Sequence, residues 1–243
     1  MNAGPTLVLD GRTVEVSAGE TIMTLARRED VYIPHLCYHP ALPPGSNCRL
    51  CVVEVNGVLH TACNTPAQPG STVMTQSERL HTVRLGLLQL LFTEGNHICP
   101  ACERSGDCEL QALAYREKML DPHFTPVFPV FAIDASHPDV ILDRNRCIHC
   151  QLCVQASERL DGKSVFAMSG RGHNAQLVVQ TDSGKLGDST LTANDAAARI
   201  CPVGALMPRK GAWRQPIGER RYDRVPIDEA GDNNSLPEEV VDV

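Results

Sequence analysis

The sequence is poor in aromatic residues and in long apolar runs. Aromatic side chains make up 4% of the 243 residues, and the formal net charge is −7. A binder of single-stranded nucleic acid needs stacking platforms and a basic groove, so both values argue against that class. The longest apolar stretch, Leu85 to Phe92, is far shorter than the roughly 20 residues of a membrane-spanning helix. We therefore expect neither a nucleic-acid partner nor a membrane span.

Signatures of bond-making catalysis and of export are also missing. The chain has no G-x-G-x-x-G after a strand, no Walker loop, no nucleophile elbow and no H-E-x-x-H sequence. Its N-terminus lacks the basic and apolar regions of a secretory signal, so a cytoplasmic location is expected.

Cysteine, by contrast, is abundant. The chain has eleven cysteines, an odd number that does not suit complete disulfide pairing. In a reducing compartment thiols in such numbers favour metal ligation over disulfide bonds.

Turn dipeptides and apolar patterning predict an α+β fold. Asp10-Gly11 and Asn56-Gly57 each separate two short apolar runs and predict hairpins. A helix capped by Ser17 or Gly19 is expected after the first hairpin, and a strand over 72–75 after the second.

Further along, residues 77–94 show the strongest helical pattern, with Ser77 as the N-cap and Gly95 as the stop. A proline-rich connector begins at Asp121. The last third is predicted to contain a strand over 140–142, a hairpin over 177–184 and a short helix over 192–200. These features predict four parts, which are residues 1–77, 78–120, 121–208 and an extended tail, 209–243.

The negative charge is concentrated at the C-terminal end of this tail. Six acidic residues and no basic residue lie between Ile227 and Val243, and a basic stretch stands just before them. Two interpretations remain open, a solvated tail or an arm that wraps a partner subunit.

The first group of candidate ligands is Cys37-x10-Cys48-x2-Cys51-x11-Cys63. Four thiolates are the set that a [2Fe–2S] cluster requires. Zinc also takes four cysteines and is the alternative, although the long first spacing is unlike common zinc pairs.

The second group is His97-x-Cys99-x2-Cys102-x5-Cys108. Three thiolates and one imidazole provide four ligands for a [4Fe–4S] cluster. The neutral imidazole removes one negative charge, which should raise the reduction potential.

The third group is Cys147-x2-Cys150-x2-Cys153 followed by a remote Cys201-Pro202. This spacing is the most specific signal in the chain and predicts a second [4Fe–4S] cluster. In two-cluster bacterial ferredoxins a further cysteine follows the third one by a few residues. Here that stretch contains Ser157 and no cysteine, so this domain is expected to hold one cluster. Four, three and four cysteines account for all eleven.

The order of these groups resembles the N-terminal iron–sulfur part of the large subunit of respiratory complex I and the N-terminal region of [FeFe] hydrogenases. A free-standing chain of this size is most similar to the diaphorase iron–sulfur (gamma) subunits of cytoplasmic NAD-reducing [NiFe] hydrogenases. The resemblance covers residues 5–210. In complex I and the [FeFe] hydrogenases the histidine stands four residues before its first cysteine, whereas His97 stands two before Cys99.

The resemblance implies a β-grasp [2Fe–2S] domain, a small helical [4Fe–4S] segment with one His and three Cys ligands, and a ferredoxin-like [4Fe–4S] domain. It also implies an electron-transfer subunit without catalytic residues, placed between a flavin- and NAD-binding diaphorase subunit, which holds FMN and NAD, and the small and large [NiFe] hydrogenase subunits. Alternatives are the same module in an NAD-linked formate dehydrogenase or complex I-like enzyme and, more distantly, a zinc-binding scaffold.

Overall fold

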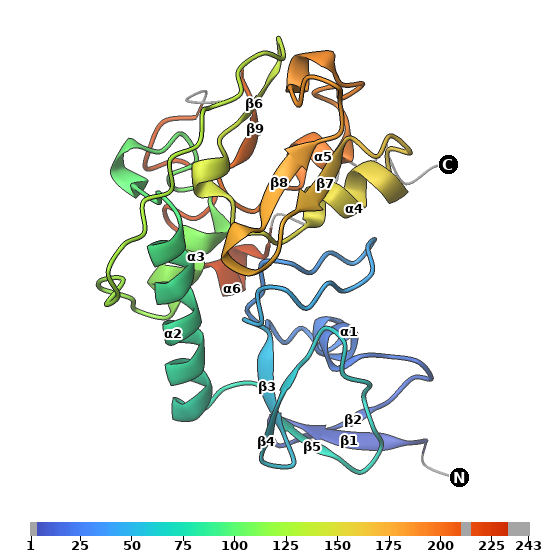
Figure 1. Ribbon diagram of the computed structural model, residues 1–243. Helices are drawn as coiled ribbons and strands as arrows, with labels where there is room; N and C mark the ends of the chain where they lie inside the picture. The colour runs from blue at the N-terminus through green and yellow to red at the C-terminus, as the bar shows by residue number, and fades with distance from the viewer. Residues whose placement is uncertain (1–3, 210–214, 233–243) are drawn as a thin grey trace.

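A computed structural model of the chain describes residues 4–209 and 215–232. Figure 1 shows an N-terminal sheet at one end of the molecule and a larger group of helices and short strands at the other, with the long helix α2 extending between them. In the described residues no helix combines the length and the apolar character that crossing a membrane requires.

The regular elements are short apart from α2. The strands are β1 (Thr6–Leu9), β2 (Arg12–Glu15), β3 (Val52–Val55), β4 (Val58–Thr61), β5 (Thr72–Met74), β6 (Val140–Leu142), β7 (Phe166–Ser169), β8 (Gln176–Val179) and β9 (Leu206–Pro208). The α-helices are α1 (Ile22–Arg28), α2 (Glu78–Glu94), α3 (Glu109–Arg116), α4 (Leu152–Arg159), α5 (Ala196–Arg199) and α6 (Ile227–Ala230).

The N-terminal unit is a five-stranded mixed sheet in the order β2-β1-β5-β3-β4. Both predicted hairpins are confirmed, because β1 pairs with β2 and β3 pairs with β4 in antiparallel register. The turn residues Asp10 and Gly11 both have positive φ, as a two-residue hairpin turn requires. The predicted cap of α1 is wrong: Thr21, not Ser17 or Gly19, is the N-cap, and it forms a capping box with Thr24.

Helix α2 is confirmed, with Ser77 as its N-cap and Gly95 as its C-cap. It is fixed to the sheet by a buried arginine. Arg84 Nη2 donates to the carbonyl oxygens of Val52 at 2.6 Å and Thr75 at 2.8 Å. Burial lowers the pKa of Arg84 to about 10, which still leaves it charged at neutral pH.

The larger part contains two separate two-stranded pairings, β6 with β9 and β7 with β8. The predicted hairpin toward Gly184 is wrong, because the partner of 177–179 lies upstream, across the turn that holds Gly170 and Gly172. Gly170 has a φ of +81°, and a Cβ there would lie 2.1 Å from the Asn174 carbonyl oxygen, so the turn requires glycine. The helix predicted over 192–200 is reduced to the four residues of α5.

The apolar residues form two cores that meet at the first cysteine group. The smaller core belongs to the N-terminal sheet and includes Cys51 and Cys63. The larger core extends through the rest of the molecule and includes Cys37 and Cys48. The loop that carries this group is therefore shared by both cores, with two thiols packed in each.

The described part of the tail, 215–232, packs against the molecule's own surface. Ile227 is fully buried and Tyr222 nearly so, and the interpretation of a solvated tail is therefore wrong for these two side chains, whereas Asp228 and Glu229 are exposed. The acidic residues Glu238, Glu239 and Asp242 lie outside the described residues, and so does any arm they form.

Asp232 joins the tail to the N-terminal unit. Its Oδ2 lies 2.9 Å from His35 Nε2 and 2.9 Å from Arg27 Nη1. Burial alone raises the pKa of Asp232, but the hydrogen bond from His35 and the charges of His35 and Arg27 outweigh it, so the pKa is lowered. His35 is almost completely buried and lies two residues before Cys37.

We expect Asp232→Ala to destabilise the N-terminal unit. The substitution leaves the His35 ring nitrogen buried without its acceptor, which costs about 1–3 kcal/mol. Asp228→Ala is the control, because Asp228 is 40% exposed and pairs with Arg116 at 3.6 Å, a contact worth about 0–1 kcal/mol. Anaerobic urea unfolding of the two variants measures the difference. Equal midpoints would show that the contact between Asp232 and His35 contributes nothing.

Candidate metal centres

The four thiols of the first group converge in one buried loop region. Cys37 and Cys48, and likewise Cys51 and Cys63, lie close enough to shift each other's pKa, and charge effects also couple Cys48 to Cys51 and Cys37 to Cys63. All four are buried and none forms a disulfide. The structure therefore places these four thiols near one another, although within the described residues no set of three or more candidate ligands is arranged to hold a single metal ion.

Hydrogen-bond donors surround these sulfurs. The backbone amide of Cys48 donates to Cys37 Sγ at 3.3 Å, and that of Leu36 donates to Cys48 Sγ at 3.4 Å. Ser46 Oγ lies 3.4 Å from Cys63 Sγ. Hydrogen bonds from Cys51 and Ser46 lower the pKa of Cys63 to about 6 against the opposing effect of burial. Such donors stabilise thiolate, the form that binds iron.

The second group brings its three cysteines together between α2 and α3. The thiols of Cys99, Cys102 and Cys108 lie close enough to affect one another electrostatically. Burial raises the pKa of Cys108 to about 12. Helix α3, which the sequence did not predict, begins directly after Cys108 and holds it in the larger core.

His97 is half-buried and stands two residues before Cys99. Its Nε2 has no hydrogen-bond partner within the described residues. Burial is the main cause that lowers the pKa of His97 to about 4, with a further contribution from Arg146, so the ring is neutral at pH 7. A Cβ on Gly95 would lie 2.5 Å from Nε2, so a glycine there leaves room for the ring. An unpaired, neutral imidazole nitrogen fits the requirements of a metal ligand.

Arg146 connects the second group with the third. It lies just before Cys147, and its Nη1 reaches Cys102 Sγ at 3.7 Å and Glu103 Oε2 at 2.6 Å. The Asp143 carboxylate holds the same guanidinium at 3.1 Å. Arg146, which stands next to a ligand of the third group, therefore contacts a predicted ligand sulfur of the second group.

The third group is carried by a tight turn that leads into α4. His149 and Gln151 have φ values of 53° and 65°, so a left-handed residue stands on each side of Cys150. This conformation turns the chain sharply, and Cys153 falls in the first turn of α4. Charge effects couple Cys147 and Cys150 with the remote Cys201. The structure thus brings all four predicted residues of this group together.

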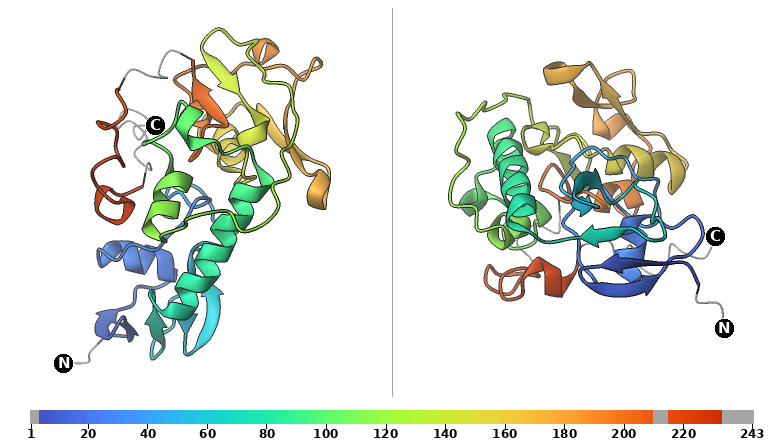
Figure 2. Two further views of the ribbon diagram at one scale, coloured as in Figure 1. Left: turned by 90° about the vertical axis from the view of Figure 1, so that its left-hand side faces the viewer. Right: turned by 90° about the horizontal axis from the view of Figure 1, so that it is seen from below.

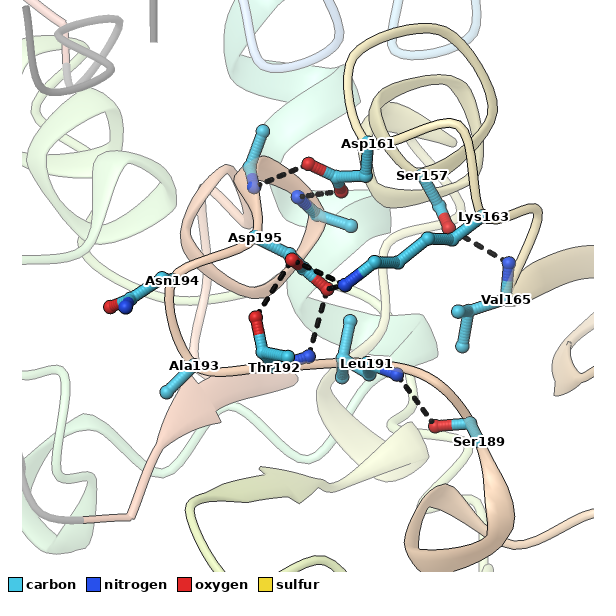
Figure 3. Close-up of polar contacts among 12 residues, drawn as sticks. Ser157, Asp161, Lys163, Val165, Ser189, Leu191, Thr192, Ala193, Asn194 and Asp195 are labelled. Carbon is cyan, nitrogen blue, oxygen red and sulfur yellow. Dashed lines mark hydrogen bonds and ion pairs between the residues drawn. The ribbon is translucent and has the colours of Figure 1, made fainter. Parts of the chain in front are cut away.

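A polar network positions the segment that delivers Cys201 (Figure 3). Asp161, just after α4, accepts hydrogen bonds from the amides of Ala196 at 2.9 Å and Ala197 at 3.0 Å. Lys163 Nζ lies 2.8 Å from both carboxylate oxygens of Asp195. These contacts fix α5 against the end of α4, so two helices that are distant in sequence place Cys153 and Cys201 in one group.

Ser157 has a structural role in α4. It is fully buried, and its Oγ accepts a hydrogen bond from the amide of Val165 at 2.8 Å. The hydroxyl therefore fixes the chain that leaves α4 toward β7.

The first and third groups are direct neighbours. Asn47, between the first group's ligands, donates its side-chain amide to the carbonyl oxygen of Cys150 at 3.1 Å. The spatial order of the groups thus places the third next to the first and, through Arg146, next to the second. Sequence order alone does not reveal this arrangement.

Family models match three consecutive parts of the chain. A 2Fe-2S iron–sulfur cluster binding domain matches residues 6–78, and an NADH-ubiquinone oxidoreductase-G iron–sulfur binding region matches residues 84–123. A 4Fe-4S single cluster domain matches residues 140–207. These matches confirm a chain of mixed helices and strands with 2Fe–2S ferredoxin-like and 4Fe–4S domains, and they give no support to a zinc scaffold.

Known proteins are similar over most of the chain. It is 35% identical to the NAD-reducing hydrogenase HoxS subunit gamma of Cupriavidus necator, over 89% of this chain and 92% of that protein. It is 33% identical to the mitochondrial NADH-ubiquinone oxidoreductase 78 kDa subunit of Candida albicans, of which it spans only 32%. A chain in the crystal structure of an NAD+-reducing [NiFe]-hydrogenase in the H2-reduced state is 50% identical, with a TM-score of 0.89 and coverage of 93% of this chain and 96% of that chain.

Asp161→Ala is expected to loosen the fourth ligand of the third group selectively. Without its carboxylate the amides of Ala196 and Ala197 lose their acceptor, at a cost of about 0.5–2 kcal/mol, and Cys201 becomes less firmly placed. On exposure to air the variant should lose one iron from this cluster faster than the unchanged protein. The growth of the EPR signal of a three-iron cluster measures this rate. Asp182→Ala, which removes an exposed carboxylate, is the control. The same rate in both variants would contradict a positioning role for Asp161.

Proposed function

The chain belongs to the family of gamma subunits of NAD-reducing hydrogenases, and from this premise we propose how its ligands are divided among its clusters. It is the iron–sulfur electron-transfer subunit of such an enzyme and has hydrogenase and diaphorase subunits as partners. We assign Cys37, Cys48, Cys51 and Cys63 to one [2Fe–2S] cluster. The two [4Fe–4S] clusters take His97, Cys99, Cys102 and Cys108, and Cys147, Cys150, Cys153 and Cys201.

The observation that carries this proposal is the grouping of the eleven thiols in the folded chain. Charge effects and hydrogen bonds link the cysteines within each set of four, three and four. When bound, each cluster supplies one-electron redox chemistry. The chain's own residues hold the sulfurs, donate hydrogen bonds to them and shield them from water.

The division of the chain into residues 1–77, 78–120, 121–208 and 209–243 stays a prediction. The sheet order β2-β1-β5-β3-β4, with α1 packed on it, supports a β-grasp unit at the N-terminus. A cytoplasmic location likewise stays a prediction, and FMN and NAD are assigned to the diaphorase partner.

The spatial order of the ligand groups supports a relay with two ends. The contact between Asn47 and Cys150 joins the first group to the third, and the contact between Arg146 and Cys102 joins the third to the second. We therefore assign the first and second groups to the two ends, where the two partner modules dock, and the third group to the middle.

The experiment that tests the assignment is metal and sulfide analysis of the anaerobically purified protein, with EPR of the reduced sample. One [2Fe–2S] and two [4Fe–4S] clusters give about ten irons and ten sulfides per chain. About six irons and six sulfides per chain would mean that the protein binds only one of the two proposed [4Fe–4S] clusters. Stoichiometric zinc without acid-labile sulfide would overturn the proposal entirely.

Replacing His97 tests the ligand assignment that depends most on the structure. His97→Ala should weaken the second cluster alone, because it removes one of four ligands. His97→Cys should keep the cluster but lower its reduction potential, since a thiolate adds negative charge. His149→Asn is the control, because His149 flanks Cys150 and asparagine tolerates its positive φ. EPR-monitored redox titration of the three variants measures the signal and the reduction potential of the second cluster. If both His97 variants leave this cluster unchanged, His97 is not a ligand.

A further inference from the structure

Two segments that adjoin the third ligand group meet at Cys102 of the second group. Residues 143–146 leave β6, residues 202–205 lead into β9, and these two strands pair side by side (Figures 1 and 2). In an antiparallel pair the end of one strand lies beside the start of the other. The backbone amide of Asp143 donates to the Ala205 carbonyl at 2.7 Å and extends this pairing. Both segments therefore reach the second group from the same end of one strand pair.

The packing at this junction is tight. A Cβ on Gly204 would lie 3.2 Å from Cys102 Sγ and 3.4 Å from Arg146 Nη1, so a side chain there would crowd both atoms. The backbone amide of Glu109, the first residue of α3, donates to the Pro202 carbonyl at 3.0 Å. A close approach and a backbone hydrogen bond thus hold the second and third groups against each other. Cys102 is the predicted ligand that lies at the junction.

The guanidinium of Arg146 occupies the same junction. Its Nη1 donates to Cys102 Sγ at 3.7 Å and to the Gly204 carbonyl at 3.5 Å. The carboxylates of Glu103, at 2.6 Å, and of Asp143, at 3.1 Å, hold this guanidinium in place. The Arg146 side chain is only 18% exposed, so salt and solvent screen these charges weakly. One positive and two negative side chains are therefore fixed beside one predicted ligand sulfur.

Fixed charges at this position affect redox chemistry, because reduction adds one negative charge to the site. Hydrogen bonds to the sulfurs and the net charge nearby are among the factors that set the reduction potential of an iron–sulfur cluster. The positive charge and the N–H group of Arg146 favour the reduced form. The carboxylate of Glu103 favours the oxidised form. The two side chains therefore act in opposite directions on the same sulfur.

We propose that Arg146, through its contact with Cys102, sets the reduction potential of the second cluster relative to the third, and that Glu103 opposes it. The proposal rests on the proposed function, since it requires a cluster at each of the two groups. One electron lost at one group is gained at the other, so a higher potential at the second group shifts this equilibrium toward the second group. An ion pair with a structural role alone would hold the junction together without such a shift.

The test uses the complete enzyme, purified anaerobically through a tag on this chain. EPR-monitored redox titration measures the potential of each cluster. Arg146→Gln removes the positive charge and should lower the potential of the second cluster, which changes its electron equilibrium with the third at least about tenfold, or 59 mV for one electron. Glu103→Gln removes the opposing charge and should raise the same potential. Arg146→Lys keeps the charge and should restore most of the potential that Arg146→Gln loses.

The matched control is Arg116→Gln. Arg116 is 13% exposed and ion-paired with Glu117, but it lies at the end of α3 remote from Cys108. This variant should leave the potential of the second cluster unchanged, and the first cluster should keep its potential in all four variants.

Opposite shifts in the Arg146→Gln and Glu103→Gln enzymes, at full iron content, are the expected result. Unchanged potentials, or shifts of the same sign, would overturn the proposal. If Arg146→Gln loses the second cluster, the Glu103→Gln enzyme decides, since a raised potential there supports the proposal and an unchanged one overturns it. The iron content and EPR of the unchanged enzyme test the proposed function separately. Absence of the second cluster there would remove both proposals, whereas a bound cluster with unmoved potentials would remove only this one.

Discussion

The ligand loops depend on backbone that turns sharply through left-handed residues that are not glycine. Ser46 and Arg49 flank Cys48 in this conformation, and His149 and Gln151 flank Cys150, with φ between 53° and 65°. Each such residue costs roughly 1–2 kcal/mol relative to ordinary backbone. The cost persists only where the surrounding structure fixes the conformation, and here it aims sulfurs and amides inward together. Cluster binding then acts on loops that are already shaped for it.

What fixes these loops comes from the rest of the fold. The first loop is packed between the two cores and bonded to Cys150 through Asn47. On its other side the pair of His35 and Asp232 ties it to the tail. The third loop is fixed by α4 and by the contacts of Asp161 with α5. Each loop is therefore constrained by residues distant in sequence, which is how strained turns remain stable without a regular element of their own.

Local chemistry determines how much of this could be predicted from the sequence. The Asp-Gly and Asn-Gly hairpins and α2 rest on interactions within a few residues, and the structure confirms them. The pairing of β7 with β8 was missed because 166–169 carries no strong strand signal, while Gly184 provided a competing turn. The cap of α1 was missed because Thr21 and Thr24 form a reciprocal pair four residues after Ser17.

The ligand sets were predictable from spacing, whereas their arrangement was not. Nothing in the sequence links Asn47 to Cys150 or Arg146 to Cys102, because each contact joins residues more than 40 positions apart. Likewise, the acidic tail looked solvated because its charges are local, while Ile227 and Tyr222 find their packing partners only in the folded chain. Tertiary contact, and not propensity, decides these features.

The scarcity of aromatic residues acquires a physical meaning in the folded chain. Of the five phenylalanines, Phe166 is fully buried, whereas three, Phe124, Phe128 and Phe131, are exposed in the connector between α3 and β6. The cores are built mainly from aliphatic side chains and thiols, with Phe166, Tyr222 and Tyr38 as their few aromatic members. Keeping Phe124, Phe128 and Phe131 in water costs hydrophobic free energy that burial recovers only when another protein covers them.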